Sequence, residues 1–240
     1  MEALLTLHNV TKRFGALTVT DAFSLEVERG VTLGILGPNG AGKTTLFNLI
    51  SGDVRPDAGT IRFAGSDITR AAPHRRCRLG IGRSYQVPHP FAGMSVFENL
   101  LVAATFGAGR SEAEASEPCL ELLRLAGLLH RANVRSGALT LLDRKRLELA
   151  RALATEPKLL LLDEVAGGLT QHEAGQLVEL VQAIRARGIT IIWIEHVVHA
   201  LLAVADRLMV LNFGARLAEG APDEIMADPE VRRVYMGLGA

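Results

Sequence analysis

The chain carries the stretch Gly37-Pro38-Asn39-Gly40-Ala41-Gly42-Lys43-Thr44-Thr45. A mostly apolar segment, residues 31–36, precedes it, and a second segment rich in apolar residues, residues 44–50, begins within it. Such a loop between a buried strand and a helix, with the spacing G-x-x-x-x-G-K-[ST], is typical of a phosphate-binding loop. Its glycines let successive backbone N–H groups face one anion, and the positive end of the following helix faces the same anion. The sequence therefore predicts a nucleoside triphosphate as ligand, with Lys43 on the β- and γ-phosphates and Thr44 completing the coordination of Mg²⁺.

Composition excludes some classes of partner. The chain has 240 residues, and Lys plus Arg equals Asp plus Glu at 26 each, so it lacks the basic excess of nucleic-acid-binding proteins. We expect no nucleic-acid partner. The start Met1-Glu2 precedes no leader-like segment, and no apolar stretch reaches the roughly 18–20 residues that span a bilayer, so a soluble, cytosolic protein is expected. Cys77 and Cys119 lack a C-x-x-C partner and are expected to be ordinary thiols.

The first part of the chain predicts a small antiparallel layer followed by helices. Apolar and polar residues alternate over residues 4–36, which favours strands that partly face solvent. Short strands are expected at residues 60–63 and 82–86, after which residues 87–90 end regular structure. From Ser95, which forms a predicted capping box with Glu98, to Ala154 the spacing of Leu and Ala is helical, with a loop at residues 107–111.

The second part has the rhythm of a parallel sheet. Residues 158–162 are almost wholly apolar, as in a strand buried on both faces. A helix is expected at residues 171–187, a buried strand at 189–194 and a helix at 197–205. We predict one α/β domain, with residues 1–86 and 156–240 as the nucleotide-binding core and residues 87–155 as an inserted helical subdomain.

Polar residues at the carboxyl ends of these strands are candidates for chemistry, because open α/β sheets place ligand groups there. Asp163 is assigned to Mg²⁺, through water, and Glu164 to the role of general base. Two solvated acids are the simpler alternative. His196 follows the strand at 189–194 and is expected to contact the γ-phosphate; a structural role, or a metal site with His199, stays open.

The sequence resembles the nucleotide-binding subunits of ATP-binding cassette (ABC) transporters. The resemblance lies in the order and approximate spacing of the phosphate loop, Gln86, Asp163-Glu164 and His196. The resemblance implies a RecA-like P-loop NTPase core that binds ATP and Mg²⁺. It also implies that Phe14 stacks on adenine, that Gln86 contacts Mg²⁺ and water and couples the site to the membrane subunit, and that Thr140 contacts nucleotide. Lys43, Gln86, Glu164 and His196 are then the catalytic residues. Arg83 and Arg75 are expected to be solvated charges.

Further segments resemble the ATPase subunits of branched-chain amino acid importers. They are Gly80-Ile81-Gly82-Arg83-Ser84-Tyr85-Gln86, Met94-Ser95-Val96-Phe97-Glu98-Asn99-Leu100, Trp193-Ile194-Glu195-His196, Asp228-Pro229-Glu230-Val231 and Tyr235-Met236-Gly237. The implied partners are transmembrane permease subunits, which Phe91 is expected to contact, a second ABC ATPase in a homo- or heterodimer, and indirectly a substrate-binding protein. The implied location is the cytoplasmic face of the inner membrane. An exporter of lipid or lipopolysaccharide and a soluble non-transport ABC ATPase remain alternatives.

The chain departs from the family's signature segment, Leu-Ser-Gly-Gly-Gln. That segment maps onto Leu139-Thr140-Leu141-Leu142-Asp143, in which Thr140 and Asp143 make a plausible helix cap. An Asn or Asp of the family is also replaced, by Thr170. As a hypothesis, this chain supplies Lys43, Asp163, Glu164 and His196 to one site of an asymmetric dimer, and its altered segment makes the other site slow.

Overall fold

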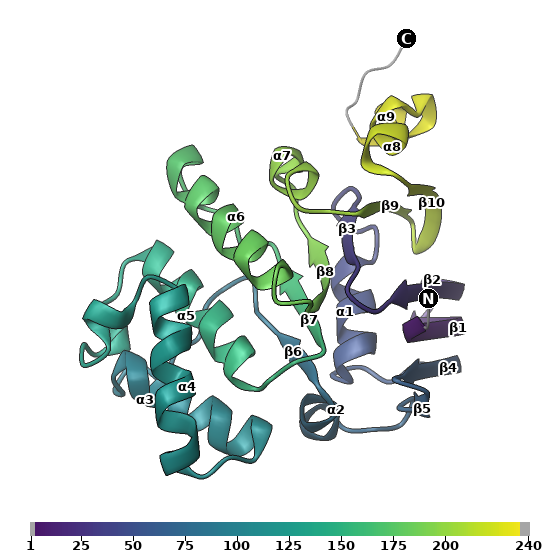
Figure 1. Cartoon of the computed structure of the whole chain (residues 1–240). Coiled ribbons are helices and arrows are strands. Elements are labelled where there is room, and N and C mark those ends of the chain that lie inside the picture. The colour runs from purple at the N-terminus through teal and green to yellow at the C-terminus, as the bar shows by residue number, and fades with distance from the viewer. Residues whose placement is uncertain (1–2, 236–240) are drawn as a thin grey trace. The chain divides into compact units, whose positions relative to one another are not determined.

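The computed structural model describes residues 3–235 and separates into two compact units (Figure 1). The first unit combines the N-terminal part of the chain up to Pro73 with the part from Thr190 onward, and the second is His74–Ile189. The segment 87–155 lies inside the second unit, and its treatment as a separate helical subdomain stays a prediction. Met1-Glu2 and Met236-Gly237 lie outside the described residues.

The first unit contains the predicted antiparallel layer. It consists of β1 (Ala3–Phe14), β2 (Leu17–Glu28), β4 (Ala58–Phe63) and β5 (Ser66–Asp67), in the order β2-β1-β4-β5. Alternation follows the pleat: Leu5 and Leu7 are buried while Thr6 between them is partly exposed. One face of the layer therefore belongs to the core, as the sequence predicts.

The first unit also contains β3 (Thr32–Leu36), β8 (Thr190–Ile194), β9 (Arg207–Asn212) and β10 (Ala215–Gly220), in the order β10-β9-β3-β8. Strand β3 runs parallel to β8 and β9, with Ile35 paired to Ile194, and β10 is antiparallel to β9. All residues of β3 and β8 are buried. Their carboxyl ends lie side by side, so the segments that follow them begin at one edge of the sheet.

Helices α1 (Lys43–Ser51) and α7 (Val198–Leu202) of this unit lie where the sequence predicts them, α7 being shorter. Two C-terminal helices, α8 (Pro222–Ala227) and α9 (Pro229–Tyr235), were not expected. Each begins with a proline, whose fixed φ suits the first helical position. That signal was present in the sequence, but the segments are too short to show a helical period.

The second unit contains the parallel pair β6 (Ile81–Arg83) and β7 (Leu159–Asp163). Its helices are α3 (Val96–Ala103), α4 (Glu112–Leu125), α5 (Leu141–Ala154) and α6 (Gln171–Arg185), together with α2 (Pro73–Leu79), which was not predicted. The predicted capping box of Ser95 and Glu98 is confirmed at the start of α3. The expected loop at residues 107–111 instead begins inside a π-helical turn, η1 (Ala104–Ala108). Within residues 3–235, no helix combines the length and the apolarity that crossing a membrane requires.

Candidate functional site

The phosphate loop joins β3 to α1 in a conformation that depends on glycine. Gly42, the residue before α1, has φ of 100°, which side-chain-bearing residues rarely adopt. At Gly37 a Cβ atom would lie 2.3 Å from the carbonyl oxygen of Leu211. The loop therefore passes too close to β9 for any side chain at this position.

The start of α1 is open to an anion. Gly42 offers no side-chain cap, and the first N–H groups of a helix have no partner within the helix. Their partial positive charge favours a phosphate at this point. The loop is held from its other side, because the Gly214 N–H donates to the Ala41 carbonyl at 2.9 Å.

Lys43 lies within the turn of the loop. Its side chain is 6% exposed, and Nζ donates to the carbonyls of Gly37 at 2.7 Å and Pro38 at 3.0 Å. The ammonium charge is thus held against the loop backbone, next to the amides that begin α1. Thr44 is exposed and Thr45 is partly exposed at the same helix start.

Phe14 presents an aromatic face at the end of β1. The residue is 49% exposed, and the Lys12 ammonium lies 5.4 Å from its ring centroid. Asp57 fixes Lys12 from the other side by an ion pair of 2.9 Å. Both hydrogen bonds to this carboxylate, the first from Lys12 and the second from the Arg13 N–H, lower the pKa of Asp57. The ring is available for stacking on a planar base.

His196 follows β8 and is exposed. Its backbone N–H donates to the Glu195 carboxylate at 3.2 Å, and Glu195 is itself 1% exposed. Because β3 and β8 are parallel neighbours, His196 and the phosphate loop begin at the same sheet edge. Among residues 3–235, no group of three or more His, Cys, Asp or Glu side chains gathers as metal ligands, and the pair His196 and His199 gains no third ligand from them.

The second unit brings together the other predicted residues. Asp163 ends β7, is 5% exposed, and accepts a hydrogen bond from Arg83 Nη2 at 3.1 Å. Glu164 accepts one from Gln86 Nε2 at 2.5 Å. Glu164 has a φ of 47°, a strained value for a non-glycine residue that is common at functional sites. The two adjacent carboxylates therefore have different partners, as expected of residues with different roles.

Two basic residues belong to this cluster although the sequence did not assign them to it. Arg83 was expected to be solvated, and this is wrong: its side chain is 8% exposed and forms an ion pair with Asp163. Lys145 is 4% exposed and donates to the Glu164 carbonyl at 3.5 Å. The signal for Arg83 was its position at the end of β6, beside the strand that carries the carboxylates.

The altered signature segment forms the start of α5. The Thr140 side chain accepts a hydrogen bond from the Asp143 N–H at 3.3 Å, which confirms the predicted cap. The Asp143 carboxylate turns inward and lies 3.3 Å from Arg131 and 3.6 Å from Arg146. The other departure has a similar explanation, because Thr170 caps α6 in a capping box with Glu173.

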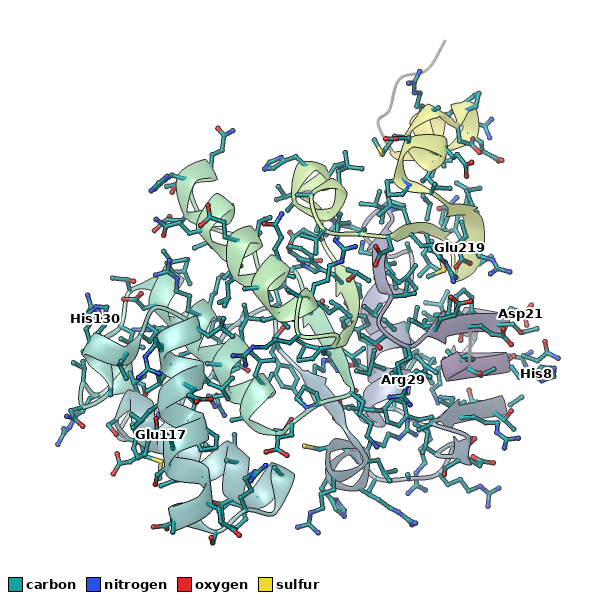
Figure 2. All side chains as sticks on the ribbon, in the orientation of Figure 1. His8, Asp21, Arg29, Glu117, His130 and Glu219 are labelled. Carbon is teal, nitrogen blue, oxygen red and sulfur yellow. The ribbon has the colours of Figure 1, made fainter. Side chains whose placement is uncertain are left out.

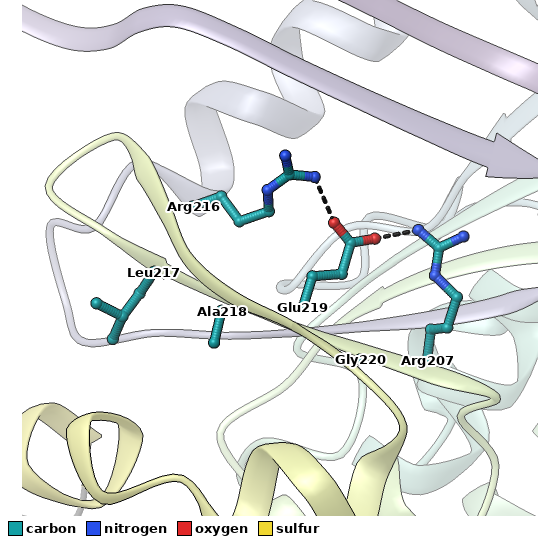
Figure 3. Close-up of a pocket in the computed structure, with 6 residues that line it drawn as sticks. All are labelled: Arg207, Arg216, Leu217, Ala218, Glu219 and Gly220. Carbon is teal, nitrogen blue, oxygen red and sulfur yellow. Dashed lines mark hydrogen bonds and ion pairs between the residues drawn. The ribbon is translucent and has the colours of Figure 1, made fainter.

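A surface pocket of about 450 Å³ lies along β10 (Figure 3). At its centre Glu219 forms ion pairs with Arg207 and with Arg216, the latter at 2.6 Å. Arg207 also donates to the Glu26 carbonyl of β2 at 3.3 Å. One carboxylate thus neutralises much of the basic charge, and the cluster ties β10 and β9 to β2.

Sequence comparison identifies the family of this chain. The ABC transporter family matches residues 20–167, which is more than half of the chain, and the family described as branched-chain amino acid ATP-binding cassette transporter matches residues 215–240. The chain is 36% identical over 249 residues to the high-affinity branched-chain amino acid transport ATP-binding protein BraF of Pseudomonas aeruginosa, covering 98% of each. It is 38% identical over 239 residues to the lipopolysaccharide export system ATP-binding protein LptB of Acidithiobacillus ferridurans, covering 99% of this chain and 98% of that protein.

Solved structures agree. The crystal structure of the ADP conformation of an ATP-binding cassette of an ABC transporter matches with a TM-score of 0.89 and 32% identity, over 99% of this chain and 100% of that one. A nucleotide-free cassette matches with a TM-score of 0.87 and 33% identity, over the full length of both. These matches confirm the predicted α/β, P-loop NTPase fold. The chain therefore belongs to the ATP-hydrolysing subunits of the ABC transporter family.

Proposed function

We propose that this ATPase powers the uptake of branched-chain or similar amino acids. The observation that carries the proposal is the match of residues 215–240 to the branched-chain family. It is supported by relatives such as BraF and the Escherichia coli protein LivG, which is 35% identical over 98% of each chain. The relative named for lipopolysaccharide export makes export the second candidate.

In the proposed reaction, residues of the first unit bind ATP. Phe14 stacks on the base, and the loop residues Gly37, Pro38, Asn39, Gly40, Ala41, Gly42, Lys43, Thr44 and Thr45 hold the phosphates. Lys43 stabilises the negative charge that develops on the phosphoryl group during transfer, and His196 donates a hydrogen bond to its terminal oxygen. Burial of Lys43 and its two carbonyl partners restrict its motion, which favours this preorganised role.

Thr44 of the first unit and residues of the second unit are proposed to supply the oxygen ligands and the base. The Thr44 hydroxyl, the Gln86 amide oxygen and the Asp163 carboxylate are hard donors of the kind that Mg²⁺ prefers. When bound, Mg²⁺ would neutralise phosphate charge. Glu164 accepts the proton of the attacking water, and Gln86, its hydrogen-bond partner, orients it. That these residues serve the same nucleotide as Lys43 rests on the family pattern.

The membrane partner is proposed to dock near Phe91. Phe91 is 46% exposed and Phe106 is 70% exposed, and both line a largely apolar pocket of about 260 Å³. The Arg151 guanidinium lies 5.0 Å from the Phe91 ring and fixes its position. An exposed apolar patch of this kind fits a permease subunit. Docking there would hold the chain at the cytoplasmic face of the inner membrane. The substrate-binding protein would then act on this chain only indirectly, through the permease.

The second ATPase subunit is proposed to be a different chain with an intact signature segment. Thr140 and the residues after it would then form the slow site, while Lys43, Asp163, Glu164 and His196 form the fast one. Thr140→Ala and Glu164→Ala in the assembled transporter test this asymmetry. We expect a large loss of ATP turnover only from Glu164→Ala, and equal losses would contradict the asymmetric arrangement.

The central experiment separates binding from turnover. Glu164→Gln should retain ATP binding and lose hydrolysis, because the amide cannot accept the proton of water. Glu179→Gln on the exposed side of α6 is the matched control and should behave like the unchanged protein. Undiminished hydrolysis by Glu164→Gln would remove Glu164 from the mechanism. Uptake of radiolabelled leucine by vesicles that contain the permease, both ATPases and the binding protein then distinguishes amino acid import from lipopolysaccharide export.

A further inference from the structure

A small pocket of about 180 Å³ lies within the second unit, among η1, α4 and α5. Its floor is apolar, since Ala104, Cys119 and Leu153 line it and are at most 5% exposed. Burial raises the pKa of the Cys119 thiol to about 11, so this side chain is uncharged. Liquid water occupies about 30 Å³ per molecule, so the pocket has the volume of about six waters. That suits a small metabolite rather than a nucleotide.

The rim of the pocket carries two acidic and two basic side chains. Arg110 and Glu156 form an ion pair with each other. Glu121 and Arg187 also line the pocket, and within the part of the chain that the structure describes the side chain of neither has a hydrogen-bond or ion-pair partner. The rim therefore offers one unmatched carboxylate and one unmatched guanidinium around an apolar floor.

The walls of the pocket contain two irregular pieces of backbone. Pro118, a lining residue, lies inside α4, where proline removes a helical hydrogen bond. Ala104, another lining residue, begins the π-helical turn η1, and such turns are frequent at functional sites. Both features weaken a helix, and both lie at the same cavity. Departures from regular structure that coincide in this way are typical of a binding site.

We propose that this pocket binds a free α-amino acid with an apolar side chain. The Arg187 guanidinium pairs with the ligand carboxylate, whose planar geometry it matches. The Glu121 carboxylate accepts hydrogen bonds from the ligand ammonium, and the ligand side chain covers Cys119, Leu122 and Leu153. The balance of charges disfavours a simple anion or cation, each of which would leave one rim group unmatched. The choice of an amino acid among small zwitterions rests on the proposed function.

Calorimetry on the full chain tests the proposal. L-Leucine is titrated to about 10 mM, a concentration that detects millimolar affinity. Isocaproate, isoamylamine and glycine each lack one feature of leucine: the ammonium, the carboxylate or the side chain. We expect saturable binding of leucine and at least about tenfold weaker binding of each analogue. Isocaproate and isoamylamine each leave one charged rim group unpaired, and glycine leaves the apolar floor uncovered.

Two variants assign the binding to this pocket. Arg187→Gln and Glu121→Gln should each weaken leucine binding at least about tenfold. Glu117→Gln and Arg124→Gln alter charges on the same helix α4 outside the pocket lining, and should leave binding unchanged; Glu117 is labelled in Figure 2. Urea unfolding of all four variants checks that they fold equally well.

Several outcomes would overturn the assignment: absence of saturable heat with leucine, equal binding of leucine and its analogues, or equal effects of the pocket and control variants. ATP binding is measured on the same samples with a fluorescent ATP analogue. Loss of leucine binding in protein that binds ATP would refute the pocket alone. Failure to bind ATP would instead refute the proposed function.

Discussion

Gly214→Ala should loosen the phosphate loop from behind. Gly214 has a φ of 75°, and a Cβ atom there would lie 1.8 Å from the Val19 carbonyl oxygen, a distance that no real contact permits. The left-handed conformation costs an L-residue about 1–2 kcal/mol. Relief of the clash costs about 1–3 kcal/mol more. Loss of the hydrogen bond from the Gly214 N–H to the Ala41 carbonyl adds about 0.5–1.5 kcal/mol, so the free energy of unfolding should fall by about 2.5–6.5 kcal/mol.

Gly30→Ala is the matched control for this substitution. Gly30 lies in the same unit with a φ of 79°, yet a Cβ atom there would meet nothing within 4 Å. Only the conformational cost of about 1–2 kcal/mol applies. Urea unfolding measures both variants, and ATP titration of Gly214→Ala should show weaker binding because Ala41 is no longer held. Equal destabilisation by the two substitutions would refute the reasoning.

Three further predictions concern single side chains. Phe213→Asn should raise the free energy of unfolding by about 0.5–1 kcal/mol. Phe213 is 87% exposed and has a φ of 45° in the two-residue turn between β9 and β10, a conformation that favours Asn. A loss of stability on urea unfolding would contradict this prediction. Asn99→Leu should lower the free energy of unfolding by about 2–4 kcal/mol. The substitution removes the hydrogen bonds that the buried Asn99 side chain makes with the backbone N–H and the carbonyl of Phe91. An unchanged midpoint of urea unfolding would show that these hydrogen bonds do not stabilise the fold. Alkylation of Cys119 at pH 8, followed by mass spectrometry, should be about 100-fold slower than alkylation of a thiol with the ordinary pKa of 9.0. The reason is that a pKa of about 11 lowers the fraction of reactive thiolate by about that factor. The alkylation rate should rise with pH, and rapid labelling at pH 8 would show that the thiol is not buried.

Strong local periodicity made much of the fold predictable. All five residues of β3 and all five of β8 are buried, and only Thr32 and Thr190 among them are polar, so the sequence alone identified both strands as buried. The helices α2, α8 and α9 were missed because none exceeds seven residues. Over so few residues a helical period cannot be distinguished from chance, and tertiary packing decides whether the segment folds as a helix.

The candidate site was predictable where one segment supplies both the geometry and the chemistry. The phosphate loop is such a segment, since its glycines and Lys43 are contiguous. The contact of Arg83 with Asp163 was not predictable, because 80 residues separate them and only the pairing of β6 with β7 brings them together. A charged residue between short apolar runs looks solvated in sequence, and its burial depends on a partner contributed by a distant strand.

The start of α5 illustrates the same dependence and bears on the asymmetric dimer. The altered segment carries the carboxylate of Asp143 three residues after Thr140, and a negative charge facing solvent there would repel a phosphate. In the structure that carboxylate is partnered by Arg131 and Arg146. Thr140 and Leu141 are exposed instead, Leu141 by 45%. A phosphate approaching this helix start would therefore meet a bulky apolar group, and the obstacle is steric rather than electrostatic. This predicts that Leu141→Gly accelerates ATP turnover of the assembled transporter, whereas Asp143→Asn does not; the opposite result would show that charge, and not bulk, makes this segment slow.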